Sequence, residues 1–430
     1  MVILHAKPCV GLRSQRGDQR ALFGDLCCSH WQAVAQLLNF VWSNMSYIKK
    51  NIPYLLLFVV PFAVFDNEYL IDKIRHASPF NQLEENVQLI VFCLVMSFFV
   101  LAGLGKKINI YVKASAVVPL VLFHFYLSFK ALVFSNTYEF VRQLSGAFLI
   151  FLVFNMMLEH TRDPLFRLDF LKKIYIVIAF WICAVLYIFF MDGFDALQHS
   201  GRFFFFSSHQ NHSGGLWACV VVILFALSLE RNRSNIFLLY ILIAVSSIFL
   251  IATGSRGALL SAVVTIGAYF FIKAINQRST LHIGVIALFF AMLVIMLNTN
   301  NFLSKYTEVQ IDRGNTREGT YANALNDFFN NFIFGYIQES SRILYSENSI
   351  LGFAQTGGVV GLVFCFLFYR TNLKLLFDKK LYLDENTRFA ILILLVVNLL
   401  SMFEAYSLNF IGIVFYLNLF MLAYLKNHDR

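Results

Sequence analysis

Two arginines stand at the start of apolar stretches, among small and polar residues. Arg202 lies in the segment GRFFFFSSHQNHSGG, and Arg256 lies in the segment TGSRGALL. A guanidinium group suits a phosphate, because its planar fork makes two parallel, charge-assisted hydrogen bonds. Ser207, Ser208 and Asn211 add hydrogen-bond donors directly before an apolar run, where a helix N-terminus also favours an anion. These residue types and their spacing indicate a site for a phosphorylated ligand.

Three further arginines have two interpretations. Arg142 begins another apolar run, while Arg313 and Arg317 lie in a long polar segment. A single arginine at the edge of hydrocarbon usually reaches lipid phosphates or pairs with an acid. For Arg202 and Arg256 we favour a ligand, because each is surrounded by small and polar residues where an apolar run begins.

Glu347 and Asn348 stand where the long polar segment returns to an apolar, glycine-rich one, SENSILGFAQTGGVVGL. A partly desolvated carboxylate holds a proton more readily, which suits Glu347 to act as a general base. An acid at a helix start is equally explained by the helix dipole. The spacing leaves both interpretations open.

The sequence offers weak signals for a metal. His209 and His212 are three residues apart, but their segment contains no acidic or cysteine partner, so we expect them to contact the ligand or solvent. Asp66 and Glu68 could together hold a divalent cation. They keep a metal-dependent enzyme as an alternative, although we predict neither a metal nor a cofactor.

The composition of the chain indicates that the helices that position these residues lie in a lipid bilayer. Hydrophobic residues make up 59% of the 430 residues and charged residues 14%, whereas soluble domains have about 45–50% and about 25%. This composition excludes a soluble fold and a disordered chain. A transmembrane helix needs about 20 mostly apolar residues. Such runs predict about twelve spans, at residues 53–70, 88–105, 112–132, 140–158, 174–191, 213–229, 236–253, 257–274, 282–298, 348–369, 388–405 and 408–425.

The basic residues predict the orientation of these spans. With the N-terminus in the cytoplasm, 24 of the 34 Lys and Arg residues lie in cytoplasmic segments and 10 in outer segments. Cytoplasmic loops carry such an excess, so we expect both termini in the cytoplasm. The net charge of +9 is then a consequence of topology and gives no indication of nucleic-acid binding. Residues 1–50 form a cytoplasmic tail, and residues 51–430 form one membrane domain with an outer loop at 299–347.

The outer loop contains a predicted interfacial helix. Asn315 and Glu318 have the spacing of a helix-start box. Apolar residues then recur at helical spacing: Ala322, Leu325, Phe329, Phe332, Ile333 and Tyr336. Such a helix lies with its aromatic face in lipid or packs against the other helices. We therefore expect an all-α integral membrane protein of about twelve transmembrane helices, with an interfacial helix in one large outer loop.

Three elements, in this order, resemble the O-antigen ligase and polymerase superfamily, bacterial enzymes that transfer lipid-linked glycans at the periplasmic face. The first is Gly201–Arg202 followed by Asn211–His212, and the second is the hexapeptide SRGALL at 255–260. The third is the large loop with Arg313 and Arg317, which ends in Glu347–Asn348 before a glycine-rich span. The match covers about residues 200–370, and SRGALL is its most specific part.

The resemblance implies a metal-independent glycosyltransferase in the bacterial inner membrane. Its arginines hold the pyrophosphate of an undecaprenyl-linked donor, and a base in the large loop activates the acceptor hydroxyl. We expect Arg202, Arg256 and Glu347 to be catalytic. Six residues are expected to bind substrate: Arg142, Asn211, His212, Arg313, Arg317 and Asn348. The expected partners are the lipid-linked oligosaccharide donor, a glycan or lipid-linked acceptor, membrane lipid and a chain-length regulator.

One departure from the family pattern favours a polymerase over a ligase. Ligases generally carry His before the Asn that closes the loop, whereas this chain carries Glu347. An acidic residue there is similar to the polymerases of O-antigen and capsule repeats. A ligase that transfers glycan to lipid A-core is the first alternative. A flippase or transporter of lipid-linked saccharide is the second, and it predicts charged groups near mid-membrane and broken helices in matched halves of the chain.

Overall fold

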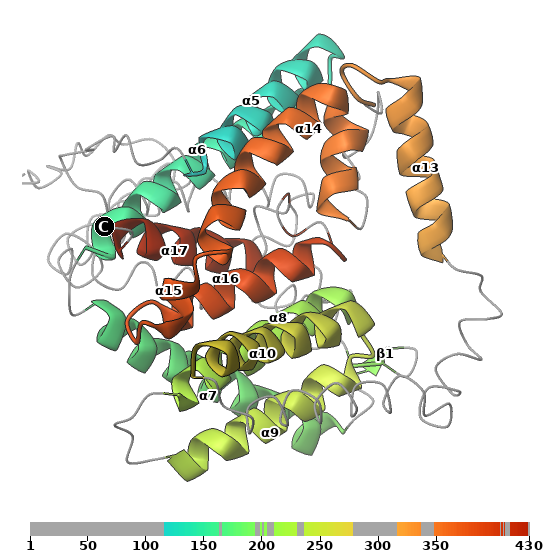
Figure 1. Ribbon diagram of the computed structural model, residues 1–430. Coiled ribbons are helices and arrows are strands. Elements are labelled where there is room, and N and C mark those ends of the chain that lie inside the picture. Colours follow the sequence, from blue (N-terminus) through green and yellow to red (C-terminus); the bar gives the residue numbers. More distant parts are fainter. Residues whose placement is uncertain are drawn as a thin grey trace, which may run out of the picture. The chain divides into compact units, whose positions relative to one another are not determined.

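The computed structural model (Figure 1) describes residues 116–162, 166–193, 198–199, 202–203, 210–229, 236–277, 316–336, 348–404, 406, 408 and 413–428. The predicted tail 1–50 and the predicted spans 53–70, 88–105 and 282–298 lie outside these residues. All structural statements below concern the described part of the chain.

Nine predicted spans correspond to described helices. They are α5 (Val118–Val133), α6 (Thr137–His160), α7 (Phe166–Asp192), α8 (Gln210–Ser228), α9 (Ile236–Ala252), α10 (Arg256–Gln277), α14 (Ser349–Leu376), α16 (Arg388–Ser401) and α17 (Ile413–His428). Within the described residues, five helices are long and apolar enough to cross a membrane: α6, α7, α8, α10 and α14. Helices α5, α9 and α16 are shorter and apolar. The chain is therefore a helical membrane protein, and the count of twelve spans stays a prediction.

Smaller elements connect these helices. Helix α13 (Thr316–Asn330) lies in the predicted outer loop, and α15 (Lys379–Leu383) lies between α14 and α16. Strands β1 (Gln198–His199) and β2 (Arg202–Phe203) form an antiparallel pair in which His199 is opposite Arg202.

The exposure of their side chains distinguishes helices in the centre of the bundle from helices at its periphery. Every residue of α17 from Val414 to Leu425 is buried, and α16 is buried over most of its length. A helix that is apolar on all sides belongs in the interior of a bundle. Helix α9, in contrast, exposes Phe237, Tyr240 and Ile248. Large exposed apolar side chains on long apolar helices are expected where the solvent is lipid.

Contacts at one end of the bundle join residues that the predicted topology would place in the cytoplasm. Asn427 Nδ2 donates to Leu158 O (2.8 Å) and to Thr161 Oγ1 (2.7 Å). The Tyr424 hydroxyl donates to Asn386 O (3.0 Å). The opposite helix ends meet one another at the site described below. This separation supports alternating helices, while the side that faces the cytoplasm is predicted from the basic residues alone.

The helix predicted in the outer loop is present, but it is shorter than its apolar pattern. Helix α13 begins at Thr316, directly after Asn315, and ends at Asn330. The prediction that Phe332, Ile333 and Tyr336 continue its face was wrong. The chain turns after Asn330, and Gly335 adopts a positive φ of 71° that favours glycine.

Helix α13 both packs against another helix and exposes aromatic side chains, the two outcomes expected from its apolar pattern. It packs on α14, where Gln355 Nε2 donates to Asp327 Oδ2 (2.8 Å), and its Ala324 is buried. Leu325 and Phe329 remain exposed. One side of the helix is thus covered by protein, and the aromatic side is available to lipid.

Helix α14 is broken within its first half, and Figure 1 shows the bend. Gly358 has φ 61° and ψ −147°, values outside the helical region. A side chain at this position would place its Cβ 2.5 Å from Ile333 O and 2.6 Å from Gly335 N. The break therefore requires glycine for its backbone conformation and for the close approach of a second chain segment.

We expect Gly358→Ala to destabilise the protein by more than the roughly 1–3 kcal/mol of a strained backbone conformation, because the methyl group also meets backbone atoms. Thermal unfolding in detergent measures the change. Gly319→Ala is the matched control, since Gly319 lies in α13 with open space around it. That control is expected to be neutral or slightly stabilising, and equal melting temperatures for both variants would contradict the account of the break.

Candidate anion site at three helix N-termini

Among the described elements, α8, α10 and α14 begin around one short turn, formed by Met402, Phe403, Glu404 and Tyr406 and called here the 402–406 turn. The Tyr406 hydroxyl donates to the backbone oxygen of Asn211 at the start of α8 (2.7 Å). The ring of His212 lies 5.8 Å from the ring of Tyr406, measured between centroids. The first family-like element therefore contacts this turn directly.

Glycines allow α10 to approach the same place. A Cβ on Gly257 would lie 2.7 Å from Phe403 Cγ, and one on Gly214 of α8 would lie 2.5 Å from Ser255 Cβ. Only hydrogen fits at these positions, so the starts of α8 and α10 pack against each other and α10 packs on the turn. Arg256 is the first residue of α10, and its side chain is exposed.

Asn348 is the N-cap residue of α14 and connects the helix to the turn by hydrogen bonds. Its Oδ1 caps the helix by accepting from the backbone N–H of Ile350 (2.8 Å), and its Nδ2 donates to Met402 O (2.6 Å). Ser349 Oγ donates to Glu404 O (3.1 Å). Both ends of the Asn348 amide thus have structural partners. Its predicted contact with substrate is a further role that these bonds do not test.

This arrangement favours an anion. The first turn of a helix presents unpaired N–H groups and the positive end of the helix dipole. Here three helix starts lie around one turn, and the exposed Arg256 adds a full positive charge. At α14 the N–H groups of Ile350 and Leu351 are already capped by Asn348 Oδ1, and the turn also carries the buried Glu404. The starts of α8 and α10 and Arg256 are therefore the groups that favour an anion. Together they can bind phosphate groups, for which helix N-termini and guanidinium groups are the common protein ligands.

The second predicted catalytic arginine, Arg202, lies in strand β2. Strand β2, which begins with Arg202, contacts α8 and α9. The side chain of Arg202 lies outside the description. Arg317 is in the first turn of α13, and its side chain is likewise not described. Arg313 and Glu347 lie outside the described residues.

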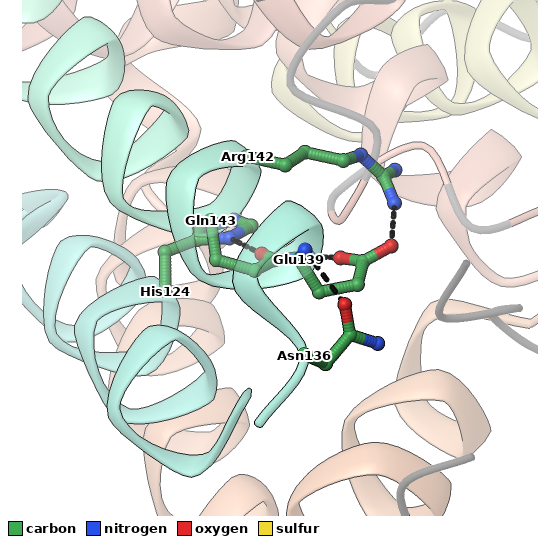
Figure 2. A network of polar contacts seen from close by, with 5 residues as sticks. All are labelled: His124, Asn136, Glu139, Arg142 and Gln143. Atoms are coloured by element: carbon green, nitrogen blue, oxygen red, sulfur yellow. Dashed lines mark hydrogen bonds and ion pairs between the residues drawn. The ribbon is translucent and has the colours of Figure 1, made fainter. Parts of the chain in front are cut away.

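Arg142 has a protein partner. Its Nη1 lies 2.7 Å from Glu139 Oε1 in the first turns of α6, and both side chains are buried. Arg142 therefore pairs with an acid, as one of its two interpretations predicted, and its contact with substrate stays a prediction. Figure 2 shows the network around it: Gln143 Nε2 donates to Glu139 Oε2 (3.1 Å), and Gln143 Oε1 lies 2.7 Å from His124 Nδ1. Since that oxygen only accepts, His124 donates from Nδ1.

The 402–406 turn was missed by sequence reasoning, which continued the span to residue 405. Helix α16 ends at Ser401 instead, because Met402 N and Phe403 N bond to Leu399 O and Leu400 O, three residues back. One signal was available. Glu404 is the only charged residue between Arg388 and Lys426, and an isolated charge in an apolar stretch marks a place of special structure or function.

Within the described residues, no three His, Cys, Asp or Glu side chains gather as a metal site would require. Asp66, Glu68 and His209 lie outside the description, so the metal-dependent alternative is not tested.

No protein-family model matches this chain, and no curated protein sequence is similar to it. The class that the fold itself defines is a helical membrane protein with several membrane-crossing helices.

Proposed function

We propose that this protein is a polysaccharide polymerase of the O-antigen or capsule type, which joins undecaprenyl-pyrophosphate-linked repeat units at the periplasmic face of a bacterial inner membrane. One observation carries the proposal. Arg256 is exposed at the start of α10, where α8 and α14 also begin. The site combines an exposed guanidinium group with helix N-termini at one end of apolar helices, which suits a ligand with a pyrophosphate head and a lipid tail.

The reaction we propose is a direct displacement. The acceptor hydroxyl oxygen attacks the anomeric carbon of the donor sugar, and the bond from that carbon to the pyrophosphate oxygen breaks. The lipid pyrophosphate leaves with the bonding electrons, and Arg256 and Arg202 stabilise its negative charge. Glu347 takes the hydroxyl proton. Attack from the face opposite the leaving group inverts the anomeric centre, and neither a metal nor a cofactor takes part.

The acceptor side gives a separate prediction. Glu347→Gln is expected to lower the polymerisation rate by about 10²-fold or more, because the amide keeps the shape of the carboxylate but cannot accept the proton. Glycan length on a gel measures the effect. Glu385→Gln is the control, since Glu385 is an exposed acid on the segment between α15 and α16. Normal polymer from Glu347→Gln would assign the base elsewhere, with Asp312, Glu318 and Glu339 as the next candidates.

A transporter of lipid-linked saccharide is the second candidate, and the break in α14 favours it. Broken membrane helices are common where transporters bind substrates and coupling ions. The polymerase is the better account, because the break is occupied by other parts of the chain, as described below, whereas the exposed cation lies at the helix ends.

Deletion of the gene, with the surface glycan separated on a gel, tests the proposal. Lipopolysaccharide or carrier bearing single repeat units is the expected result. Loss of all capped lipopolysaccharide while lipid-linked polymer accumulates indicates the ligase. Single lipid-linked units retained on the cytoplasmic side indicate the transporter.

A further inference from the structure

The break in α14 exchanges hydrogen bonds between two chain segments. Val359 N donates to Phe332 O (2.9 Å), where a continuous helix would direct it to Gln355 O. Gln355 O instead accepts from Tyr336 N (2.7 Å). Buried backbone groups need partners, so the segment after α13 supplies bonds that α14 gives up at Gly358.

One backbone oxygen at the break is satisfied by a side chain from a third helix. Lys130, near the end of α5, donates from Nζ to Thr356 O (3.0 Å), a carbonyl on the N-terminal side of the break. The same Nζ donates to Phe334 O and to Gly335 O, at 2.6 Å each. An ammonium group has three protons, and here each has a carbonyl acceptor. Lys130 is buried, although its charge is costly to remove from water.

The geometry points to a cation site at the break of α14, lined by the carbonyl oxygens of Phe334, Gly335 and Thr356 and occupied by the ammonium group of Lys130. Unwound carbonyls of broken membrane helices bind free Na⁺ in transporters. Here the chain supplies its own cation, tethered to α5. The class of ligand that this site takes is a monovalent cation with three hydrogen-bond donors, such as an alkylammonium ion.

The site fixes the first half of α14 in place. Without the ammonium group, the buried carbonyl oxygens of Gly335 and Thr356 would lose the Lys130 hydrogen bonds that join the two segments at the break. Phe334 O would keep the hydroxyl of Tyr126 as a donor (2.7 Å). Residues 349–357 carry Asn348 and its bond to Met402 at the helix start. Lys130 is therefore a positioning residue for the anion site, a consequence that rests on the proposed function. A permanently occupied cation site also disfavours coupling of transport to Na⁺ at this break.

Chemical rescue tests the site. Lys130→Ala removes the atoms of n-propylammonium, which can then be added as the probe. Spin labels at Phe329 of α13 and Phe366 of α14, both exposed, report the distance across the break in a variant without the seven native cysteines. We expect one narrow distance distribution with Lys130, a broad one with alanine, and a narrow one again on addition of n-propylammonium. n-Propanol, which has the same size without the charge, is the control.

A narrow distribution in Lys130→Ala without any amine would overturn the inference, as would equal rescue by n-propanol and n-propylammonium. If Lys130→Ala does not accumulate, its yield in cells grown with either compound is the measurement. Recovery with the amine alone supports the site, and no recovery or equal recovery contradicts it. These measurements do not use glycan transfer, so a failure of the proposed function is read separately, from the Arg256 variants.

Discussion

Arg256→Ala is expected to lower the rate of glycan transfer by about 10²–10³-fold, the range found when one group that stabilises transition-state charge is removed. The side chain is exposed at the start of α10, so its loss removes little packing and the protein should still fold. Arg256→Lys should recover little activity, because an ammonium group lacks the planar fork that binds two phosphate oxygens. Arg202→Ala is expected to behave in the same way.

Arg370→Ala is the matched control for these variants. Arg370 is an exposed arginine in the second half of α14, beyond the break. It should transfer glycan at the normal rate, and all variants should have similar melting temperatures in detergent. Normal transfer by both Arg256→Ala and Arg202→Ala would remove the arginines from the mechanism.

Glu139→Ala is expected to cause the largest loss of stability. Removing one partner of a buried ion pair costs about 3–5 kcal/mol, because the other charge stays buried without its counter-charge. Glu139 is fully buried and accepts from both Arg142 and Gln143. Its backbone N–H also donates to Asn136 Oδ1 (3.0 Å), the side chain that caps the start of α6. The free energy of unfolding in mixed detergent micelles is the measurement.

Two comparisons separate the ion pair from a general effect of substitution. Glu159→Ala replaces an exposed glutamate at the other end of the same helix, and it should change the free energy of unfolding little. The double variant Glu139→Ala with Arg142→Leu removes both charges, and it should recover much of the lost stability. A Glu139→Ala variant as stable as Glu159→Ala would show that the pair contributes nothing.

Helix positions could be predicted from the sequence because membrane spans have a required length and polarity. Nine predicted spans coincide with described helices, usually within a few residues at each end. The ends themselves depend on local chemistry that apolar patterning does not report. Asn348 and Asn136 cap their helices as recognisable N-cap residues, while the early end of α16 at Ser401 has no breaker residue to announce it.

The break in α14 and the pairing of Arg142 show two different limits of sequence reasoning. The glycine pair at 357–358 was visible, but a positive φ at Gly358 depends on a segment more than twenty residues earlier, which only the folded chain brings near. The Arg142–Glu139 pair is local: three residues apart on a helix, the two side chains share a face. That spacing could have predicted it, and it explains why Arg142 differs from Arg256.

Reconstitution in vesicles most directly tests the central claim that this protein forms glycosidic bonds. Purified protein is supplied with polyprenyl-pyrophosphate-linked repeat units, and the glycan products and their side of the bilayer are determined. The account predicts a ladder of longer glycans with wild-type protein, release of polyprenyl pyrophosphate in equal amount to the bonds formed, and no ladder with Arg256→Ala. Movement of unchanged units across the bilayer without elongation would contradict it.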